Sequence, residues 1–172
     1  LDIPFTSVTI DADESYPADL KAGDIPMYIS RAKARAYASE LRENDLLITS
    51  DTIVWLNGEM LGKPQDEADA KAMLSCLGGQ THEVYTAVCF ADMNGELETL
   101  VDCTKVTFKT LSEEEINYYV TKYHPLDKAG AYGVQEWIGY VGVTRMEGSY
   151  FNVMGFPISR VYDWLKRYGY SH

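Results

Sequence analysis

Residues 81–91, Thr-His-Glu-Val-Tyr-Thr-Ala-Val-Cys-Phe-Ala, and residues 98–109 decide the fold. Apolar and polar side chains alternate along both stretches, and Asn94-Gly95, a pair typical of tight turns, lies between them. The two stretches are therefore predicted to form an antiparallel hairpin.

The sequence around this hairpin predicts further strands and several helices. Upstream, residues 46–49 are apolar and typical of a buried strand, which we expect to end at Ser50-Asp51-Thr52 before residues 53–55 continue to the Asn57-Gly58 turn. A short strand is expected over residues 1–10. Helices combined with hairpins indicate an α/β or α+β chain with a mixed sheet rather than an all-parallel one. The expected helices cover residues 24–42, 66–77, 112–122 and 157–168.

Length, charge and cysteine content restrict the classes of protein that fit. The chain of 172 residues suits one domain, 1–172, and its formal net charge of −11 argues against a non-specific nucleic-acid partner. A phosphorylated small molecule is still compatible with that charge. The sequence has no run of about 18 apolar residues and no signal-peptide pattern, so we expect no membrane partner. Three cysteines outside any C-x-x-C pair favour a reducing compartment, here the cytoplasm.

Two residues stand out as candidates for chemistry. Asp51 directly follows the predicted strand, where ligands gather in α/β sheets, and could serve as a general base or metal ligand. It could equally be a turn residue or a helix cap. Lys33 falls within the apolar face of the first helix, so it either extends along the surface to water or reaches into a cleft.

Three further residues carry weaker signals. Lys63, held between Gly62 and Pro64, would suit a phosphate, although such tripeptides are common in turns. Glu14 belongs to an acidic loop that could supply a carboxylate to Mg²⁺ or could simply be solvated. Gln135 could bond the edge of a base, because its amide both donates and accepts, or it could be a surface residue.

Taken in order along the chain, these residues fall in seven blocks that resemble the Maf family of nucleoside triphosphate pyrophosphatases. The resemblance covers nearly the whole sequence, and the order of the blocks makes it more specific than any single motif. The blocks are residues 13–17 (DESYP), 31–34 (RAKA), 50–54 (SDTIV), 61–64 (LGKP), 79–86 (GQTHEVYT), 128–135 (KAGAYGVQ) and 147–157 (EGSYFNVMGFP).

This resemblance implies an α/β fold with a mixed, twisted sheet flanked by helices. It also implies two lobes around a deep cleft, similar to inosine triphosphate pyrophosphatases. The implied reaction hydrolyses a nucleoside triphosphate to its monophosphate and pyrophosphate with a divalent metal, Mg²⁺, Mn²⁺ or Co²⁺. By position in the motifs, Asp51 would activate water, Asp51 and Glu14 would hold the metal, and Lys33 and Lys63 would bind the phosphates.

The resemblance also bears on the substrate. Thr52 and Gln135 occupy positions where the family discriminates bases, and their identities are similar to the dTTP/UTP branch rather than the 7-methyl-GTP branch. A 7-methyl-GTP pyrophosphatase and a nucleotide-binding regulator of septum formation without significant turnover are the alternatives. A homodimer is compatible with the family.

One family element is missing from the chain. Maf proteins open with a strand and a Ser-Pro-Arg-Arg turn that binds phosphate, whereas this sequence begins at Leu1. We expect that segment to lie upstream in the full protein.

Overall fold

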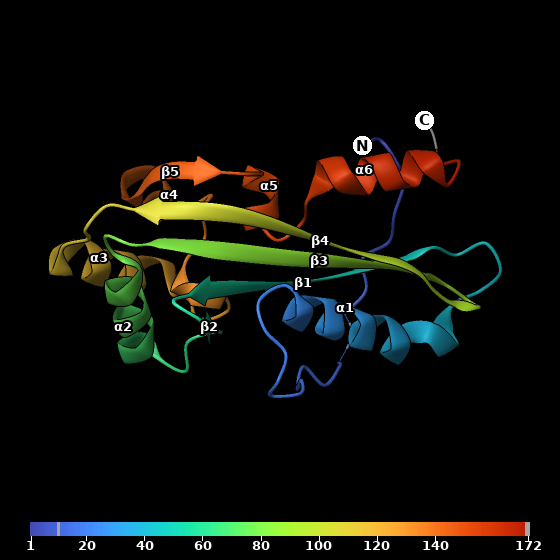
Figure 1. Ribbon diagram of the computed structural model, residues 1–172, viewed down its shortest axis with the longest axis horizontal. Coiled ribbons are helices and arrows are strands. Elements are labelled where there is room, and N and C mark those ends of the chain that lie inside the picture. The colour runs from blue at the N-terminus through green and yellow to red at the C-terminus, as the bar shows by residue number, and fades with distance from the viewer. Residues whose placement is uncertain (10, 171–172) are drawn as a thin grey trace.

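A five-stranded sheet forms the centre of the molecule (Figure 1). The computed structural model describes residues 1–9 and 11–170. The strand order is β2-β1-β3-β4-β5, and every neighbouring pair is antiparallel. The bounds are β1 Leu47–Leu56, β2 Glu59–Leu61, β3 Thr81–Asp92, β4 Gly95–Phe108 and β5 Val143–Glu147.

The predicted central hairpin is confirmed. β3 and β4 pair from Thr81 opposite Thr107 to Asp92 opposite Gly95, with one irregularity between Phe90 and Ala91. Its long alternating strands need only a two-residue turn, which explains why the local sequence was sufficient to predict it.

The α/β class with helices flanking a twisted sheet is confirmed, but the expected mixture of parallel and antiparallel pairs is not seen among the described strands. β1 joins β2 through the Asn57-Gly58 turn, and β3 joins β4 through another hairpin, so both connections reverse the chain. The connection from β2 to β3 runs through a helix, and β3 again runs antiparallel to β1.

The helices follow the predicted positions with small shifts. The first is shorter than expected, because α1 (Asp24–Tyr37) gives way to the 3₁₀ turn η1 (Ala38–Glu40). Asp66 caps α2 (Glu67–Leu77), and Ser112 forms a capping box with Glu115 at the start of α3 (Glu113–Tyr123). The remaining helices are η2 (Ala129–Ala131), α4 (Trp137–Gly142), α5 (Tyr150–Val153) and α6 (Ile158–Arg167).

The two faces of the sheet are covered by different helices, as Figure 1 shows for α1 and α6. α1 packs on one face, where Ile25 and Ile29 bury Ile53 of β1. On the other face, α6 packs at one end of the hairpin, with Trp164 stacked on Phe90. At the opposite end of that face a larger core cluster joins β1, β3 and β4 to α2, α3 and α4.

The start of the chain differs from the expectation. Residues 1–9 have no regular secondary structure, so the predicted strand over residues 1–10 is wrong as far as it is described, and residue 10 lies outside the described residues. Ile3 packs against the cluster of α6, whereas Phe5 is 88% exposed, so the segment contacts the core at one residue without forming a strand. Within the described residues, no helix has the length and apolar character needed to cross a membrane.

Candidate active site

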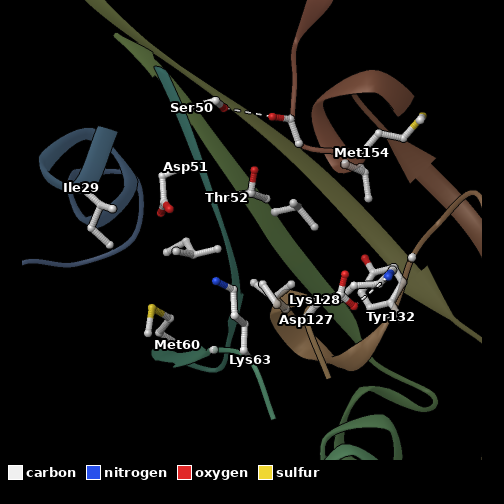
Figure 2. A pocket seen from close by; sticks show the side chains of 18 of the residues that line it. Ile29, Ser50, Asp51, Thr52, Met60, Lys63, Asp127, Lys128, Tyr132 and Met154 are labelled. Atoms are coloured by element: carbon white, nitrogen blue, oxygen red, sulfur yellow. Dashed lines mark hydrogen bonds and ion pairs between the residues drawn. The ribbon is translucent and has the colours of Figure 1, made fainter. Parts of the chain in front are cut away.

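A pocket of about 520 Å³ lies beside the open edge of β1. β1 pairs with β3 from Leu47 to Trp55, but on its other side β2 covers only Val54 to Leu56. The edge at Ser50–Ile53 therefore faces the pocket rather than another described strand. In Figure 2, Asp51 of β1 and Lys63, which follows β2, both project into this space.

Asp51 itself lies within β1, not after its end. The prediction that the strand stops at Ser50-Asp51-Thr52 is wrong, because Asp51 stands opposite Ala87 and pairing with β3 continues to Trp55. Neighbouring strand residues point to opposite faces. Asp51 therefore shares the α1 face with Ile53, whereas Thr52 lies on the opposite face. Because the pocket wraps around a strand edge, it is lined by both side chains.

Lys33 of α1 connects the carboxylates at the α1 end of the pocket. Its Nζ lies 2.8 Å from Asp51 Oδ1 and 3.0 Å from Glu14 Oε1. Lys63 Nζ lies 3.6 Å from the other carboxylate oxygen of Glu14. Of the two open alternatives for Lys33, the structure favours the cleft, because its ammonium also lies 3.4 Å from the Ser50 carbonyl oxygen of the open edge.

Helical spacing explains how Lys33 reaches this place. Ile25 and Ile29 are buried against the sheet, and Lys33 follows Ile29 by one further turn of α1. Its stem therefore leaves the helix along the buried face, and the ammonium emerges at the edge of β1.

The surroundings shift the charges of this cluster in different directions. Burial raises the pKa of Asp51, against the opposing hydrogen bond and charge of Lys33. The hydrogen bond from Lys33 lowers the pKa of Glu14. Burial alone would lower the pKa of Lys33, but its bonds to Asp51 and Glu14 outweigh this and raise it. At neutral pH the cluster thus holds a charged ammonium and two carboxylates, of which Asp51 is the stronger base.

The other end of the pocket has no net charge, because its only charged lining residues in the described part of the chain, Asp127 and Lys128 beside Tyr132 in Figure 2, form an ion pair. Thr52, Tyr132, Gln135 and Met154 line it. All six residues predicted for the site therefore line one pocket. They are Asp51 and Glu14, predicted as catalytic or metal-binding, and Lys33, Lys63, Thr52 and Gln135, predicted to bind the substrate. The pocket thus has a charged end, beside α1, and a neutral polar end, beside α5.

The donor set fits a divalent metal of the Mg²⁺ kind. Among residues 1–9 and 11–170, no group of three or more His, Cys, Asp or Glu side chains could hold a metal ion. Mg²⁺ needs fewer protein ligands, because it keeps waters and binds through one or two carboxylates plus substrate phosphates. Glu14 and Asp51 match that smaller requirement, since both carboxylates lie close to one cation, the Lys33 ammonium.

Sequence reasoning missed several residues that line the pocket. Asp127 and Lys128 form a 2.9 Å ion pair at its rim, and Tyr132 forms part of its wall. Lys128 and Tyr132 lie in the 128–135 block, so their place in that block was the available signal. Met154, after α5, lies in the 147–157 block, so the same signal applied to it.

The sequence matches a known protein family over nearly its whole length. The family model described as Maf-like protein matches residues 1–168. The chain belongs to the Maf family. The resemblance carried by the seven sequence blocks is thereby confirmed, and its blocks contribute the charged end and the neutral end of the same pocket.

Similar Maf proteins cover most of the chain. One from Bacteroides thetaiotaomicron is 54% identical over 157 residues, which is 91% of this chain and 81% of the relative. One from Flavobacterium johnsoniae is 50% identical, covering 96% of this chain and 84% of the relative. One from Porphyromonas gingivalis is 47% identical, covering 100% of this chain and 87% of the relative. Each is named dTTP/UTP pyrophosphatase.

Proposed function

We propose that this Maf protein hydrolyses dTTP and UTP to the nucleoside monophosphate and pyrophosphate. The observation that carries the proposal is the grouping of Asp51, Glu14, Lys33 and Lys63 at one end of a pocket whose other end is neutral and polar. A triphosphate suits the charged end, and a base without formal charge suits the neutral end. The names of the similar Maf proteins support the same substrates.

Asp51 is the proposed general base. Its carboxylate takes a proton from a water molecule, the water oxygen bonds to the α-phosphorus, and the bond from that phosphorus to the bridging oxygen breaks. Pyrophosphate leaves with the bridging oxygen. A buried carboxylate with a raised pKa holds a proton more readily than an exposed one, which favours this role.

Lys33 and Lys63 supply positive charge to the phosphate oxygens. Lys63 is more exposed than Lys33, with 59% of its side chain accessible against 21%, so it can reach a ligand from the mouth of the pocket. Lys33 is fixed between Asp51 and Glu14 and so also keeps both carboxylates in place. A divalent metal held by Glu14 and Asp51 would add charge stabilisation at the phosphate oxygens.

The substrate is tested by pyrophosphate release from dTTP, UTP, CTP, 7-methyl-GTP and ITP with Mg²⁺ or Mn²⁺. We expect dTTP and UTP to be hydrolysed fastest, with the monophosphate as the second product. Faster hydrolysis of 7-methyl-GTP would overturn the substrate assignment made from Thr52 and Gln135. Tight nucleotide binding without any turnover would instead favour the regulator of septum formation.

A further inference from the structure

Thr86 is a buried residue next to the neutral end of the pocket. It stands directly opposite Thr52 in the β1–β3 ladder, and it is 0% exposed. Its hydroxyl oxygen makes two short contacts, one of 2.9 Å to Thr52 Oγ1 and one of 2.8 Å to the backbone carbonyl oxygen of Asn152 in α5. Thr86 does not line the pocket itself.

Counting protons fixes the direction of both hydrogen bonds. A carbonyl oxygen can only accept, so Thr86 donates its single hydroxyl proton to Asn152. The contact with Thr52 must then use the Thr52 proton, with Thr86 as acceptor. Thr52 therefore has no proton left for the pocket and offers only a lone pair.

The Asn152 carbonyl, which accepts the Thr86 proton, belongs to a residue with further hydrogen bonds. Asn152 is 0% exposed, and its side-chain Nδ2 donates to the Val84 carbonyl oxygen at 3.0 Å and to Thr104 Oγ1 at 2.9 Å. Ser50 Oγ lies 2.9 Å from the Gly155 carbonyl oxygen, which ties the segment after α5 to β1. The acceptor for the Thr86 proton thus keeps its position beside the sheet.

We propose that Thr86 is a positioning residue for base selection, because it holds the Thr52 hydroxyl as a pure hydrogen-bond acceptor toward the N3–H of thymine or uracil. This inference rests on the proposed function. Thymine and uracil carry a proton on N3, whereas cytosine N3 is an unprotonated acceptor. An acceptor-only Thr52 would bond the first two bases and would meet cytosine N3 lone pair to lone pair, which leaves a polar group unpaired.

The test compares kcat/KM for dTTP and dCTP in variants of Thr86. Thr86→Val keeps the shape but removes the hydroxyl, so the Thr52 hydroxyl becomes free to turn and donate. The dTTP-to-dCTP ratio is expected to fall roughly three- to tenfold, the worth of one neutral hydrogen bond. Thr86→Ser keeps the hydroxyl and should hold the ratio within about twofold. If Thr86→Val does not fold, Thr86→Ala removes the same hydroxyl.

A double-mutant cycle distinguishes positioning from a general structural role. If Thr86 acts through Thr52, then adding Thr86→Val to Thr52→Val leaves the dTTP-to-dCTP ratio of Thr52→Val unchanged within about twofold. An equal fall of the ratio in both backgrounds would overturn the inference, since Thr86 would then act without Thr52.

The sheet offers a matched control. Thr81 and Thr107 form a second cross-strand pair, with their hydroxyl oxygens 2.8 Å apart, between β3 and β4 and outside the pocket lining. Thr107→Val should leave the ratio unchanged, and a fall equal to that of Thr86→Val would overturn the inference. Absence of dTTP hydrolysis in the wild type would contradict the proposed function itself. A selective wild type with an unaltered ratio in Thr86→Val would contradict only the role of Thr86.

Discussion

Lys33 forms ion pairs with both carboxylates at the charged end of the pocket. Its ammonium is the common partner of Asp51 and Glu14, and its side chain is only 21% accessible. Without it, two carboxylates would face each other across a partly buried space, where like charges favour protonation. Lys33 therefore keeps Asp51 in the ionised form that a general base needs, in addition to attracting phosphate.

Lys33→Met tests this role through the pH dependence of activity. Loss of the ammonium should raise the pKa of Asp51 further, because the opposing bond and charge are gone while burial remains. At low pH, kcat/KM for dTTP should fall as Asp51 becomes protonated. In Lys33→Met this fall should begin at a higher pH, and the maximum value of kcat/KM should be lower. A fall that begins at the wild-type pH would show that Lys33 does not control Asp51. Lys109→Met, at a lysine paired with Glu115 outside the pocket lining, is the control.

At the scale of elements, local signals predicted more than long-range ones. The hairpin, the Asp66 cap and the Ser112–Glu115 capping box depend on residues within a few positions of each other, and all three are confirmed. The hairpin turn itself is displaced by one residue, because Gly95 already pairs with Asp92 and the two turn residues are Met93 and Asn94. The predicted end of the strand at Ser50-Asp51-Thr52 was wrong because polar residues at an open sheet edge can face a pocket without ending the strand. The length of β1 is set by its pairing with β3, which joins residues far apart in sequence.

The candidate site shows the same division. The motif blocks identified the six residues that meet in the pocket, but not the contacts between them. The bond from Thr86 to Asn152 spans 66 positions, and the contact between Ser50 and Gly155 spans 105. Periodicity and capping rules do not predict contacts between residues so far apart in sequence. The role of the Thr52 hydroxyl as a hydrogen-bond acceptor could therefore be found only from the three-dimensional arrangement.

The connection from β5 to α5 gives a prediction about packing. Gly148 has φ +131°, and an added Cβ would lie 2.6 Å from Thr104 Oγ1. Gly95 has nearly the same conformation, φ +127°, but open space around it. Gly148→Ala should therefore lower the free energy of unfolding more than Gly95→Ala, by about 1–3 kcal/mol, the usual cost of overpacking. Chemical denaturation of both variants measures this, and equal losses would mean that the Thr104 contact is unimportant.

At the scale of the whole molecule, the pocket lies between core clusters that share the sheet. Ile29 and Ile53 belong to the cluster beneath α1, while Val84 and Tyr132 belong to the large cluster with α2 and α3. His82, 1% exposed, packs edge-on against Phe108 and Tyr132 of the large cluster, with its Nε2 2.7 Å from the Tyr132 hydroxyl. The stability of one pocket wall is thus linked to a buried histidine.

This burial predicts a dependence of stability on pH. Desolvation lowers the pKa of His82 to about 4 from 6.5, so the unfolded chain binds a proton at a higher pH than the folded chain. The contribution of the buried, neutral His82 to the free energy of unfolding is therefore present above pH 6.5 and is lost as the pH falls toward 4. We expect about 2 kcal/mol of that contribution to be lost between pH 7.5 and pH 5.

Chemical denaturation at these two pH values measures the loss. His82→Phe should be less stable at pH 7.5 but should lose about 2 kcal/mol less than the wild type on going to pH 5. His124→Gln, at an exposed histidine, should keep the wild-type loss. The same loss in His82→Phe and the wild type would refute this role for His82.

The role of Asp51 as general base is tested by dTTP hydrolysis in Asp51→Asn. Asparagine nearly preserves the shape of Asp51 but cannot take a proton from water, so the rate of pyrophosphate release should fall about 10²- to 10⁴-fold while dTTP still binds. Asp102→Asn is the matched control, since Asp102 also lies on a strand and pairs with a cation, Arg160, outside the pocket lining, and it should keep the wild-type rate. Near-normal hydrolysis by Asp51→Asn would contradict the assignment of Asp51 as the general base.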